Sequence, residues 1–421
     1  METVAIVGTG VAGLGCAWNL KERARLTLFE QENRPGGHTN TVVIEENGKS
    51  IPIDTGFIVF NKVTYPNLTR LFTELDIAIK PAEMSFSVQH LATGIEYNGM
   101  GINRIFAQRR NILRPRFHQL LRKIGKFFEV ARSCLADPSC ETMTLREFVD
   151  THNLGRDFFE FYLIPMCSAV WSTDPRKILD FPAWSLIRFF HNHGFLGVNT
   201  HHPWFTVDGG AKQYVQKMLT ACGAPRLKAK VVEVSESPEG AHIRLENGEI
   251  QTFDRVVLAT HADQALRLLK NPTADQHRLL SPFHYQYNHA VLHTDASVMP
   301  KRKRAWASWN YRVEKEESAT THYWMNALQG ISKNKNYFLT LNGKHLLRPQ
   351  SLLYEKEYEH PIFTLEALRA QKELPSLNKT SPDQKLFFCG SYFGHGFHED
   401  AYTSGMDCST AIHEDPSLAC A

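Results

Sequence analysis

The chain has 421 residues, of which 43% are hydrophobic and 22% charged, proportions that are typical of two or three globular domains and exclude a largely disordered chain. The formal net charge of +3 gives no reason to expect nucleic acid as a partner. The longest apolar run, Phe161–Trp171, is too short to cross a bilayer, and we find no targeting segment. We therefore expect a cytoplasmic protein whose eight scattered cysteines are reduced thiols.

The first thirty residues predict a strand, a glycine turn, a helix and a second strand. Thr3–Val7 is a β-branched run typical of a buried parallel strand. The pattern of Leu14–Leu20 predicts a helix, and that of Arg25–Phe29 predicts a second strand. The turn from Gly8 to Gly13 has the sequence Gly-Thr-Gly-Val-Ala-Gly. This spacing between a strand and a helix predicts a dinucleotide-binding site.

The glycines and a following carboxylate each have a physical role in such a site. Gly8 permits the tight turn, Gly10 lets the backbone approach a diphosphate, and Gly13 lets helix and strand pack closely. The diphosphate would lie at the helix N-terminus, where free N–H groups favour negative charge. Glu30, at the end of the second strand, is placed to bind an adenosine ribose, which favours FAD or NAD over NADP.

Later segments favour FAD over NAD. A second glycine turn, Gly36-Gly37, follows Glu30, and a predicted strand then ends in an Asp-x-Gly turn at residues 54–56. Further strands are predicted at Val231–Val234, Arg255–Ala259 and Leu386–Cys389, the last leading into Gly390. The block GFHEDAYTSG, which begins at Gly396, resembles the closing motif of a flavoprotein superfamily, and this resemblance implies a helix whose N-terminus holds the electron-rich side of a flavin.

Together these blocks resemble the superfamily of flavin-containing amine oxidases, protoporphyrinogen oxidases and phytoene desaturases. Arg34 and Gly36-Gly37 match its Arg-x-Gly-Gly-Arg motif, with His38 in place of the second arginine, and Asp400 replaces a glycine of its closing motif. The resemblance implies FAD, which we expect to be non-covalent because no position for a covalent link is evident. It assigns cofactor binding to Gly8, Gly10, Ala12, Gly13, Glu30, Gln31, Gly36, Gly37, His38, Thr39, Thr55, Gly56, Val232, Gly390, Glu399, Asp400 and Ala401.

The middle of the chain resembles more specifically a bacterial family of predicted NAD/FAD-binding proteins. The blocks that carry this resemblance include Trp171-Ser172-Thr173, the run from Trp306 to Tyr311 and Phe397-His398-Glu399-Asp400. That family is similar to the flavoprotein half of plant cyclopropane-fatty-acid synthases and often accompanies related methyltransferases. The resemblance implies a flavoprotein acting on fatty acyl chains, with a methyltransferase as a candidate partner.

The expected fold is mixed α/β, with a Rossmann-like FAD-binding domain and an interleaved cap domain of mixed sheet and helices. We expect the FAD domain to comprise residues 1–80, 205–265 and 380–421, and the cap residues 81–204 and 266–379. Strands are predicted at Tyr285–His293, Trp306–Arg312 and Thr321–Leu328, with a helix at Asp263–Leu269. One face of these strands either lines an apolar tunnel or forms ordinary core; the substrate candidates are Trp306, Trp309, Tyr311, Trp324 and Asn326.

Residues 97–128 contain eight bases and no acid, with apolar residues at helical spacing between them. Such a segment either contacts an anionic membrane surface, which would make the protein peripheral, or packs as a solvated helix on the cap. Lys301–Arg304 is a second basic run that can join the same surface.

No metal site is expected, because the histidine pairs lack a third ligand at standard spacing. His395 and His398 precede the flavin-binding helix and are the candidate proton donors or acceptors, unless they only stabilise the loop. We expect hydride transfer between a fatty acyl chain and the flavin. The alternatives are amine oxidation, carotenoid-type desaturation, and a non-catalytic flavin-binding partner of a lipid methyltransferase.

Overall fold

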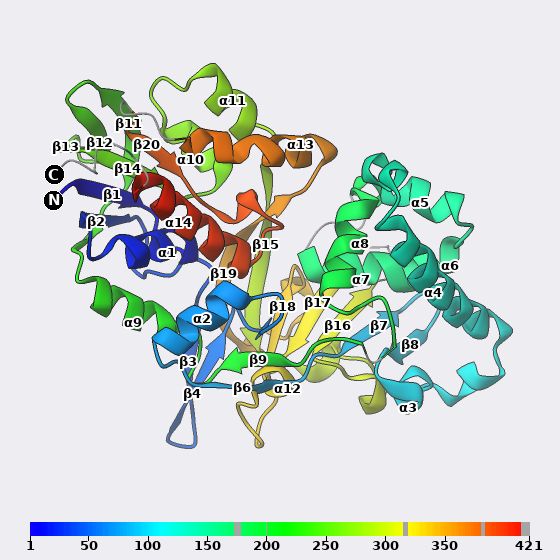
Figure 1. The fold of residues 1–421 in the computed structure, drawn as a ribbon. Coiled ribbons are helices and arrows are strands. Elements are labelled where there is room, and N and C mark those ends of the chain that lie inside the picture. The colour runs from blue at the N-terminus through cyan, green and yellow to red at the C-terminus, as the bar shows by residue number, and fades with distance from the viewer. Residues whose placement is uncertain (172–177, 199, 315–318, 380–383, 414–421) are drawn as a thin grey trace.

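The computed structural model describes residues 1–171, 178–198, 200–314, 319–379 and 384–413 as a mixed α/β protein (Figure 1). Ser172 and Thr173, which belong to one of the family-like blocks, lie outside the described residues. The N-terminus lies at one side of the molecule, and a group of helices lies at the opposite side (Figure 1).

A five-stranded parallel sheet holds the glycine turn. Its strand order is β10-β2-β1-β14-β20, with bounds Arg226–Lys228, Arg25–Glu30, Thr3–Val7, Arg255–Leu258 and Leu386–Phe388. The predictions for β1, β2, β14 and β20 are confirmed to within one residue at each end. Helix α1 (Val11–Leu20) begins three residues earlier than predicted, because extended Gly10 ends the turn and the helix follows directly.

The two faces of this sheet bury different side chains. Val4 and Ile6 pack toward α1, α2 (Pro66–Glu74), α9 (Lys212–Cys222) and α14 (His398–His413). The opposite face, with Ala5 and Val7, packs against a small antiparallel sheet and three helices. These elements are β11 (Val231–Ser237), β12 (Gly240–Leu245), β13 (Ile250–Phe253), α10 (Ala262–Leu268), α11 (Ala274–Leu280) and α13 (Leu365–Glu373). Thus α11 and α13, from the stretch assigned above to the cap, pack on the parallel sheet.

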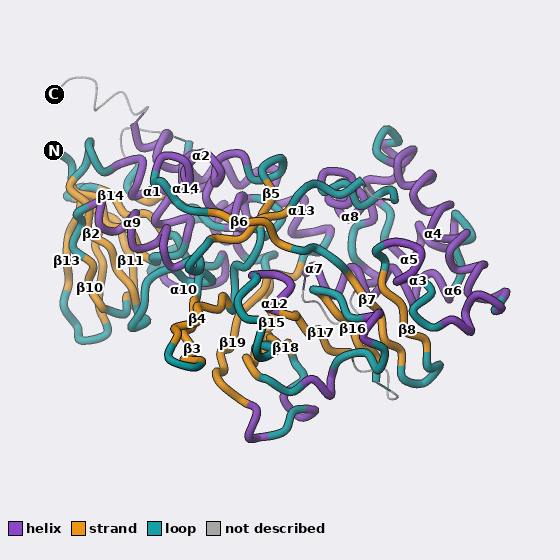
Figure 2. Tube along the Cα trace, turned by 90° about the horizontal axis from the view of Figure 1, so that it is seen from below, coloured by secondary structure: helices purple, strands orange, loops and turns teal. Residues whose placement is uncertain are grey.

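A seven-stranded mixed sheet forms the second half of the molecule, and its strands lie side by side in Figure 2. The order is β19-β15-β18-β17-β16-β7-β8, with bounds Leu352–Ile362, His284–His293, Phe338–Leu341, Ala319–Trp324, Trp309–Val313, Phe86–His90 and Ile95–Asn98. All neighbours are antiparallel except β16 and β7.

The structure corrects two predicted strands of this sheet. The strand expected at Trp306–Arg312 begins only at Trp309, because residues 303–305 form a 3-10 turn. The strand expected at Thr321–Leu328 ends at Trp324, where α12 (Met325–Gln329) begins. The Asn326 side chain explains this end, since it donates to two carbonyls of the following loop and accepts from its backbone.

A group of helices covers the β7–β8 end of this sheet (Figures 1 and 2). They are α3 (Gly101–Ile105), α4 (Pro115–Cys134), α5 (Leu145–Thr151), α6 (Arg156–Phe158), α7 (Ile164–Trp171) and α8 (Ala183–Asn192). Their shared core includes Val88, Tyr97, Phe127, Phe148 and Phe190. No helix in the described ranges is both long and apolar enough to span a bilayer.

The two halves are joined by short connecting sheets. The hairpin of β3 (Thr41–Glu46) and β4 (Lys49–Asp54) leads into β5 (Phe60–Asn61), which pairs with β9 (Trp204–Val207). On its other edge β9 pairs with β6 (Ile79–Ala82). The chain therefore passes between the two halves several times.

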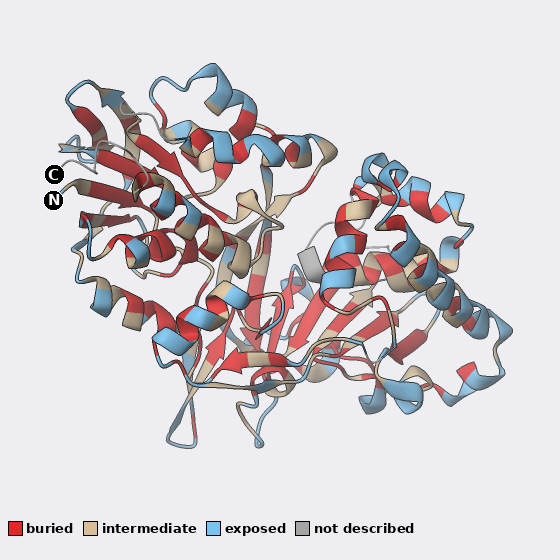
Figure 3. Ribbon diagram, in the orientation of Figure 1, coloured by how far each residue is buried: buried red, intermediate tan, exposed pale blue. Residues whose placement is uncertain are grey.

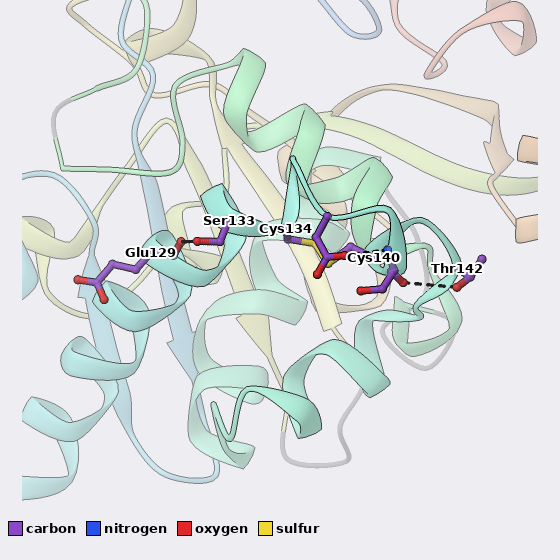
Figure 4. Close-up of a disulfide and its surroundings, with 7 residues drawn as sticks. Glu129, Ser133, Cys134, Cys140 and Thr142 are labelled. Carbon is purple, nitrogen blue, oxygen red and sulfur yellow. Dashed lines mark hydrogen bonds between the residues drawn. A yellow bond between two sulfur atoms is a disulfide. The ribbon is translucent and has the colours of Figure 1, made fainter.

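One cysteine pair departs from the expectation of reduced thiols. Cys134, at the end of α4, forms a disulfide with Cys140, and their Cα atoms are 5.8 Å apart (Figure 4). The 3-10 turn Pro138–Thr142 reverses the chain and brings the second cysteine back to the helix end, and both residues are buried. The prediction missed this pair because the spacing alone does not reveal the turn.

Candidate functional site

A cavity of about 1630 Å³ extends from the glycine turns of the parallel sheet to the helices beyond β8. Of the predicted site residues, it is lined by Gly8, Gly10, Ala12, Glu30, Gln31, Gly37, His38, Thr55, Gly56, Trp309, Gly390, His395, His398 and Ala401. Segments that are far apart in the sequence therefore meet around one space.

The two glycine turns touch each other at the start of α1. The Gly36 N–H donates to the Thr9 carbonyl (2.9 Å), and a Cβ added to Gly37 would lie 3.2 Å from the Gly10 Cα. A Cβ on Gly13 would lie 2.1 Å from the Gly8 carbonyl oxygen, whereas one on Gly10 meets no protein atom within 4 Å. Gly10 thus leaves open space at a helix N-terminus, as a bound diphosphate requires.

Glu30 both orders the first turn and faces the cavity. Its carboxylate accepts from the Thr9 hydroxyl (2.5 Å), the Thr9 N–H (3.2 Å) and the Glu32 N–H (2.9 Å). These bonds hold the carboxylate at the end of β2, where a ribose hydroxyl would be an additional donor. Gln31 lines the cavity beside it.

The Arg34 side chain stabilises the second glycine turn, Gly36-Gly37, through hydrogen bonds to backbone carbonyls. Its guanidinium donates to the carbonyls of Thr39 (3.0 Å) and Gly37 (2.7 Å). The Asp-x-Gly turn packs directly on this segment, since a Cβ on Gly56 would lie 1.9 Å from the His38 carbonyl oxygen. Backbone closeness, rather than side-chain chemistry, explains the glycine at position 56.

His38 lies close to two other histidines, His261 and His360, and this grouping was not predicted from the sequence. Its ring centroid is 5.4 Å from that of His360 and 6.1 Å from that of His261, and its Nε2 shares a hydrogen bond with the Glu359 carbonyl (3.1 Å). Burial, followed by the neighbouring imidazoles, lowers the pKa of His38 well below its usual value. A neutral ring therefore stands where the superfamily motif has a cationic arginine.

His398 is part of a hydrogen-bonded group at the start of α14. Its Nε2 lies 2.9 Å from the Thr39 hydroxyl and 2.8 Å from the Tyr214 hydroxyl, and its ring stacks on Phe57 with centroids 3.9 Å apart. Burial lowers the pKa of His398 to about 3, and that of His395 is lowered by burial and then by Arg188. Both rings are neutral at pH 7 and line the cavity.

The two acids of the closing block do not line the cavity. Glu399 accepts from the N–H groups of Asn67 (2.8 Å) and Leu68 (2.9 Å) at the start of α2. Asp400 accepts from the N–H groups of His395 (3.0 Å) and Phe397 (2.9 Å). In this structure Asp400 holds the histidine loop, and Glu399 joins α14 to α2.

Asp400 is expected to make stability depend on pH. Burial raises its pKa to about 6 from an ordinary 3.8, although its two backbone bonds oppose the shift. A raised folded-state pKa favours the protonated form, so stability falls by up to about 3 kcal/mol as pH rises from 4 to 7. Asp400→Asn keeps an oxygen acceptor and cannot ionise, so its urea-unfolding free energy should vary less over this range.

The difference in pH dependence between the wild type and Asp400→Asn measures the contribution of Asp400 alone. Burial also raises the pKa of Asp54 to about 6, but Asp54 titrates equally in the wild type and in Asp400→Asn. Parallel pH curves for the two flavin-loaded proteins would show that Asp400 is already solvated and carries no such cost.

Several predicted site residues lie away from the cavity wall. Gly36, Thr39 and Gly13 support the turns behind it, and Val232 directly follows the segment 229–231, which does line it.

The structure brings only Trp309, of the five substrate candidates, to the cavity. Trp306 and Trp324 pack edge to face 5.4 Å apart in a separate core cluster, Tyr311 is buried, and Asn326 organises a loop. Trp306 does not reach the cavity because β16 begins only at Trp309, so Trp306 is not part of the strand in which alternate side chains were expected to face the cavity.

The sequence missed most of the wall on the far side of the cavity, which we call the apolar arm. Residues of β7, β8, β9, the helices beyond β8 and the loops between these elements form the apolar arm. None of the residues that line it is Asp, Glu, Lys or Arg. They are Met84, Ser85, Phe86, Tyr97, Gly99, Met100, Gly101, Ile102, Ile105, Leu121, Ile124, Gly125, Phe128, Tyr162, Met166, Phe189, Gly194, Phe195, Gly197, Val198, His201 and Trp204.

Strands β17 and β18 add Tyr323, Leu339 and Leu341 to the same wall. The apolar residues at helical spacing in the basic segment could have predicted the α4 part of this wall. The other residues of the apolar arm belong to no sequence motif. In the described parts of the chain, no cluster of three His, Cys, Asp or Glu side chains is placed to hold a metal ion.

Comparisons with known proteins give a family for this chain and a fold that it shares with solved structures. The family model described as flavin containing amine oxidoreductase matches residues 11–333. No curated protein sequence matches the chain. Solved structures that are similar include putrescine oxidase bound to putrescine, at 14% identity and TM-score 0.69, with 98% of this chain and 99% of that chain covered.

Two other solved structures are similar over the same extent. Cyclohexylamine oxidase from Brevibacterium oxydans IH-35A is 15% identical with a TM-score of 0.69, covering 98% of this chain and 99% of that one. A CLA-producing fatty acid isomerase from P. acnes is 13% identical with a TM-score of 0.68, covering 97% of this chain and 98% of that one. At these identities the likeness is one of fold.

Proposed function

The chain belongs to the flavin containing amine oxidoreductase family and is a flavin-dependent oxidoreductase, and from this premise we propose that it binds FAD non-covalently and acts on a fatty acyl chain. The observation that carries the substrate class is the uncharged, aromatic and aliphatic lining of the apolar arm. Such a wall gains free energy by burying methylene groups, at about 0.8 kcal/mol for each.

The residues at the other end of the cavity fit FAD. The open space at Gly10 and the N-terminus of α1 would take the diphosphate, and the Glu30 carboxylate would take the ribose hydroxyls. The strand that follows β10, with Val231 at the wall, would contact the adenine. Gly56, Gly390 and Ala401 would lie along the flavin.

When bound, FAD supplies acceptance or donation of a hydride at its N5 atom. The chain itself must hold the substrate beside that position and keep water away. Transfer of a hydride from one carbon requires a base for the proton of the next carbon if a double bond forms. His395 and His398 line the cavity and are unprotonated at pH 7, so each has a ring nitrogen that can accept that proton, although the burial that lowers their pKa also makes them weaker bases.

Amine oxidation is the second candidate, because putrescine oxidase and cyclohexylamine oxidase have this fold. A cationic amine is stabilised by a carboxylate, and the residues that form the apolar arm include none. The lining therefore favours an uncharged chain.

The test is the visible spectrum of the flavin-loaded protein, recorded without oxygen while a soluble fatty acyl ester is added. Bleaching of the flavin band by the ester, and not by an amine of the same chain length, is expected. Bleaching by the amine alone would establish amine oxidation, and ester binding without a spectral change would indicate a non-catalytic partner. A reduced flavin that an unsaturated ester reoxidises would show that the reaction runs in the opposite direction.

A further inference from the structure

We propose that the open end of the apolar arm is a docking surface for an anionic phospholipid bilayer, through which the acyl chain enters. The docking surface consists of α3, the turn Arg109–Leu113, the first half of α4 and the basic run Lys301–Arg304. The inference deepens the proposed function and rests on it for the nature of the entering chain.

The apolar arm reaches solvent at this surface. Ile102 on α3 lines the cavity and is nevertheless 76% exposed, and Val198, which also lines the cavity, is 78% exposed. Gly125 of α4 is likewise both exposed and part of the wall. Figure 3 shows α3 exposed along most of its length. A side chain that lines a cavity and is also widely exposed marks the cavity's opening.

Large apolar side chains point outward beside this opening. Leu113 is 86% exposed and Ile112 48% exposed, in the turn that joins α3 to α4. A single exposed leucine needs no explanation, but three large exposed aliphatic residues between positions 102 and 113, beside a cavity opening, do. Ile102, Ile112 and Leu113 can insert between lipid headgroups, continuous with the apolar arm.

The same surface is strongly basic. Arg104 pairs with Glu83 and Arg116 with Asp157, whereas Arg109, Arg110 and Arg122 have no carboxylate partner among the described residues. The stretch from 97 to 128 contains no acid of its own.

A second basic run, nearly two hundred residues away in sequence, joins this surface. The 3-10 turn Lys303–Ala305 contacts α3, and the buried Glu96 carboxylate accepts from the N–H groups of Lys301 (3.1 Å) and Arg302 (3.3 Å). All four side chains of Lys301–Arg304 are exposed. A buried acid therefore fixes the backbone while the cations face outward, where anionic headgroups would neutralise them.

Charge and shape together select a lipid surface. Basic residues around exposed aliphatic side chains match a layer with anionic headgroups above acyl chains. The opening leads from that layer into a wall without charge, so an acyl chain can pass from bilayer to cavity without crossing water.

The test is flotation of the flavin-loaded protein with vesicles of phosphatidylcholine containing phosphatidylglycerol, against phosphatidylcholine alone. We expect binding to the mixed vesicles that weakens as salt is raised. The double variant Arg109→Glu/Arg304→Glu should bind at least about 20-fold more weakly, and Leu113→Asp about tenfold.

The matched controls carry the same changes elsewhere. Arg226→Glu/Lys228→Glu on β10 alters the net charge equally, and Ile250→Asp on β13 replaces another exposed aliphatic residue. Both should bind as the wild type does. Equal weakening by the controls, or no flotation with anionic vesicles at any salt concentration, would overturn the docking surface and leave an acidic protein as the partner.

A second readout separates this inference from the proposed function. The Arg109→Glu/Arg304→Glu variant should bleach normally with a soluble acyl ester but more slowly with the same chain held in anionic vesicles. Vesicle binding without bleaching by any acyl compound would refute the acyl substrate and retain the docking surface. Bleaching by the soluble ester without vesicle binding would do the reverse.

Discussion

Gly10→Val is expected to give a folded protein that has lost its flavin. Gly10 has ordinary backbone angles (φ −65°, ψ 175°), and a Cβ there meets no protein atom within 4 Å. The branched side chain would instead fill the space at the N-terminus of α1 that a diphosphate needs. We expect FAD affinity to fall by about 100-fold or more, as overpacking of some 3 kcal/mol implies. Flavin absorbance per protein and the unfolding midpoint of the apoprotein measure the two properties separately.

The control for this variant is a glycine in the same structural situation at the other end of the cavity. Of the chain's glycines, Gly10 and Gly125 alone combine open space for a Cβ with a backbone conformation that any residue can adopt. Gly125→Leu should keep its full flavin content. If Gly10→Val also kept full flavin, the assignment of this turn to the diphosphate would be wrong.

Gly125→Leu is itself expected to stabilise the protein and to impair turnover of acyl substrates. Glycine in the interior of α4 costs nearly 1 kcal/mol relative to a good helix former, and nothing in the packing requires it. Its position on the wall of the apolar arm explains why a destabilising residue stands there. The leucine should raise the free energy of unfolding by about 0.8 kcal/mol and lower kcat/KM about tenfold.

Two measurements on flavin-loaded Gly125→Leu test the expected gain in stability and the expected loss of turnover. Urea unfolding gives the stability change, and anaerobic bleaching with acyl esters of increasing length gives the block, which should be greatest for the longest chain. A more stable variant with unchanged rates for every chain length would show that substrate does not pass this side of α4.

The nucleotide-binding half could be predicted from the sequence because its signals are local. The β-branched run at Thr3–Val7 and the glycines at 8, 10 and 13 determine strand, turn and helix within a few residues. The closeness of Gly36, Gly37 and Gly56 to other backbone atoms likewise explains why the second turn was visible as a motif.

The apolar arm could not be predicted because it depends on non-local pairing. Whether Trp306 or Trp309 faces the cavity is decided by where β16 begins, and that depends on its pairing with β7 and β17. Tyr323 faces the cavity while Trp324 packs with Trp306 on the other side of the sheet. The histidine group around His38 forms only when β19 reaches the second glycine turn.

The pairing of early and late strands has a consequence for how the chain folds during synthesis. Strand β1 pairs with β14 and β7 pairs with β16, so neither sheet can form until a segment made more than two hundred residues later has been synthesised. Strand β20, which pairs with β14, is made later still. The ribosome releases the N-terminal region with its sheet edges unpaired, which favours slow folding and a need for chaperones. A chain truncated before residue 384 would lack the edge strand β20, which pairs with β14, and helix α14, which packs on α1, and it should aggregate instead of forming a smaller stable domain.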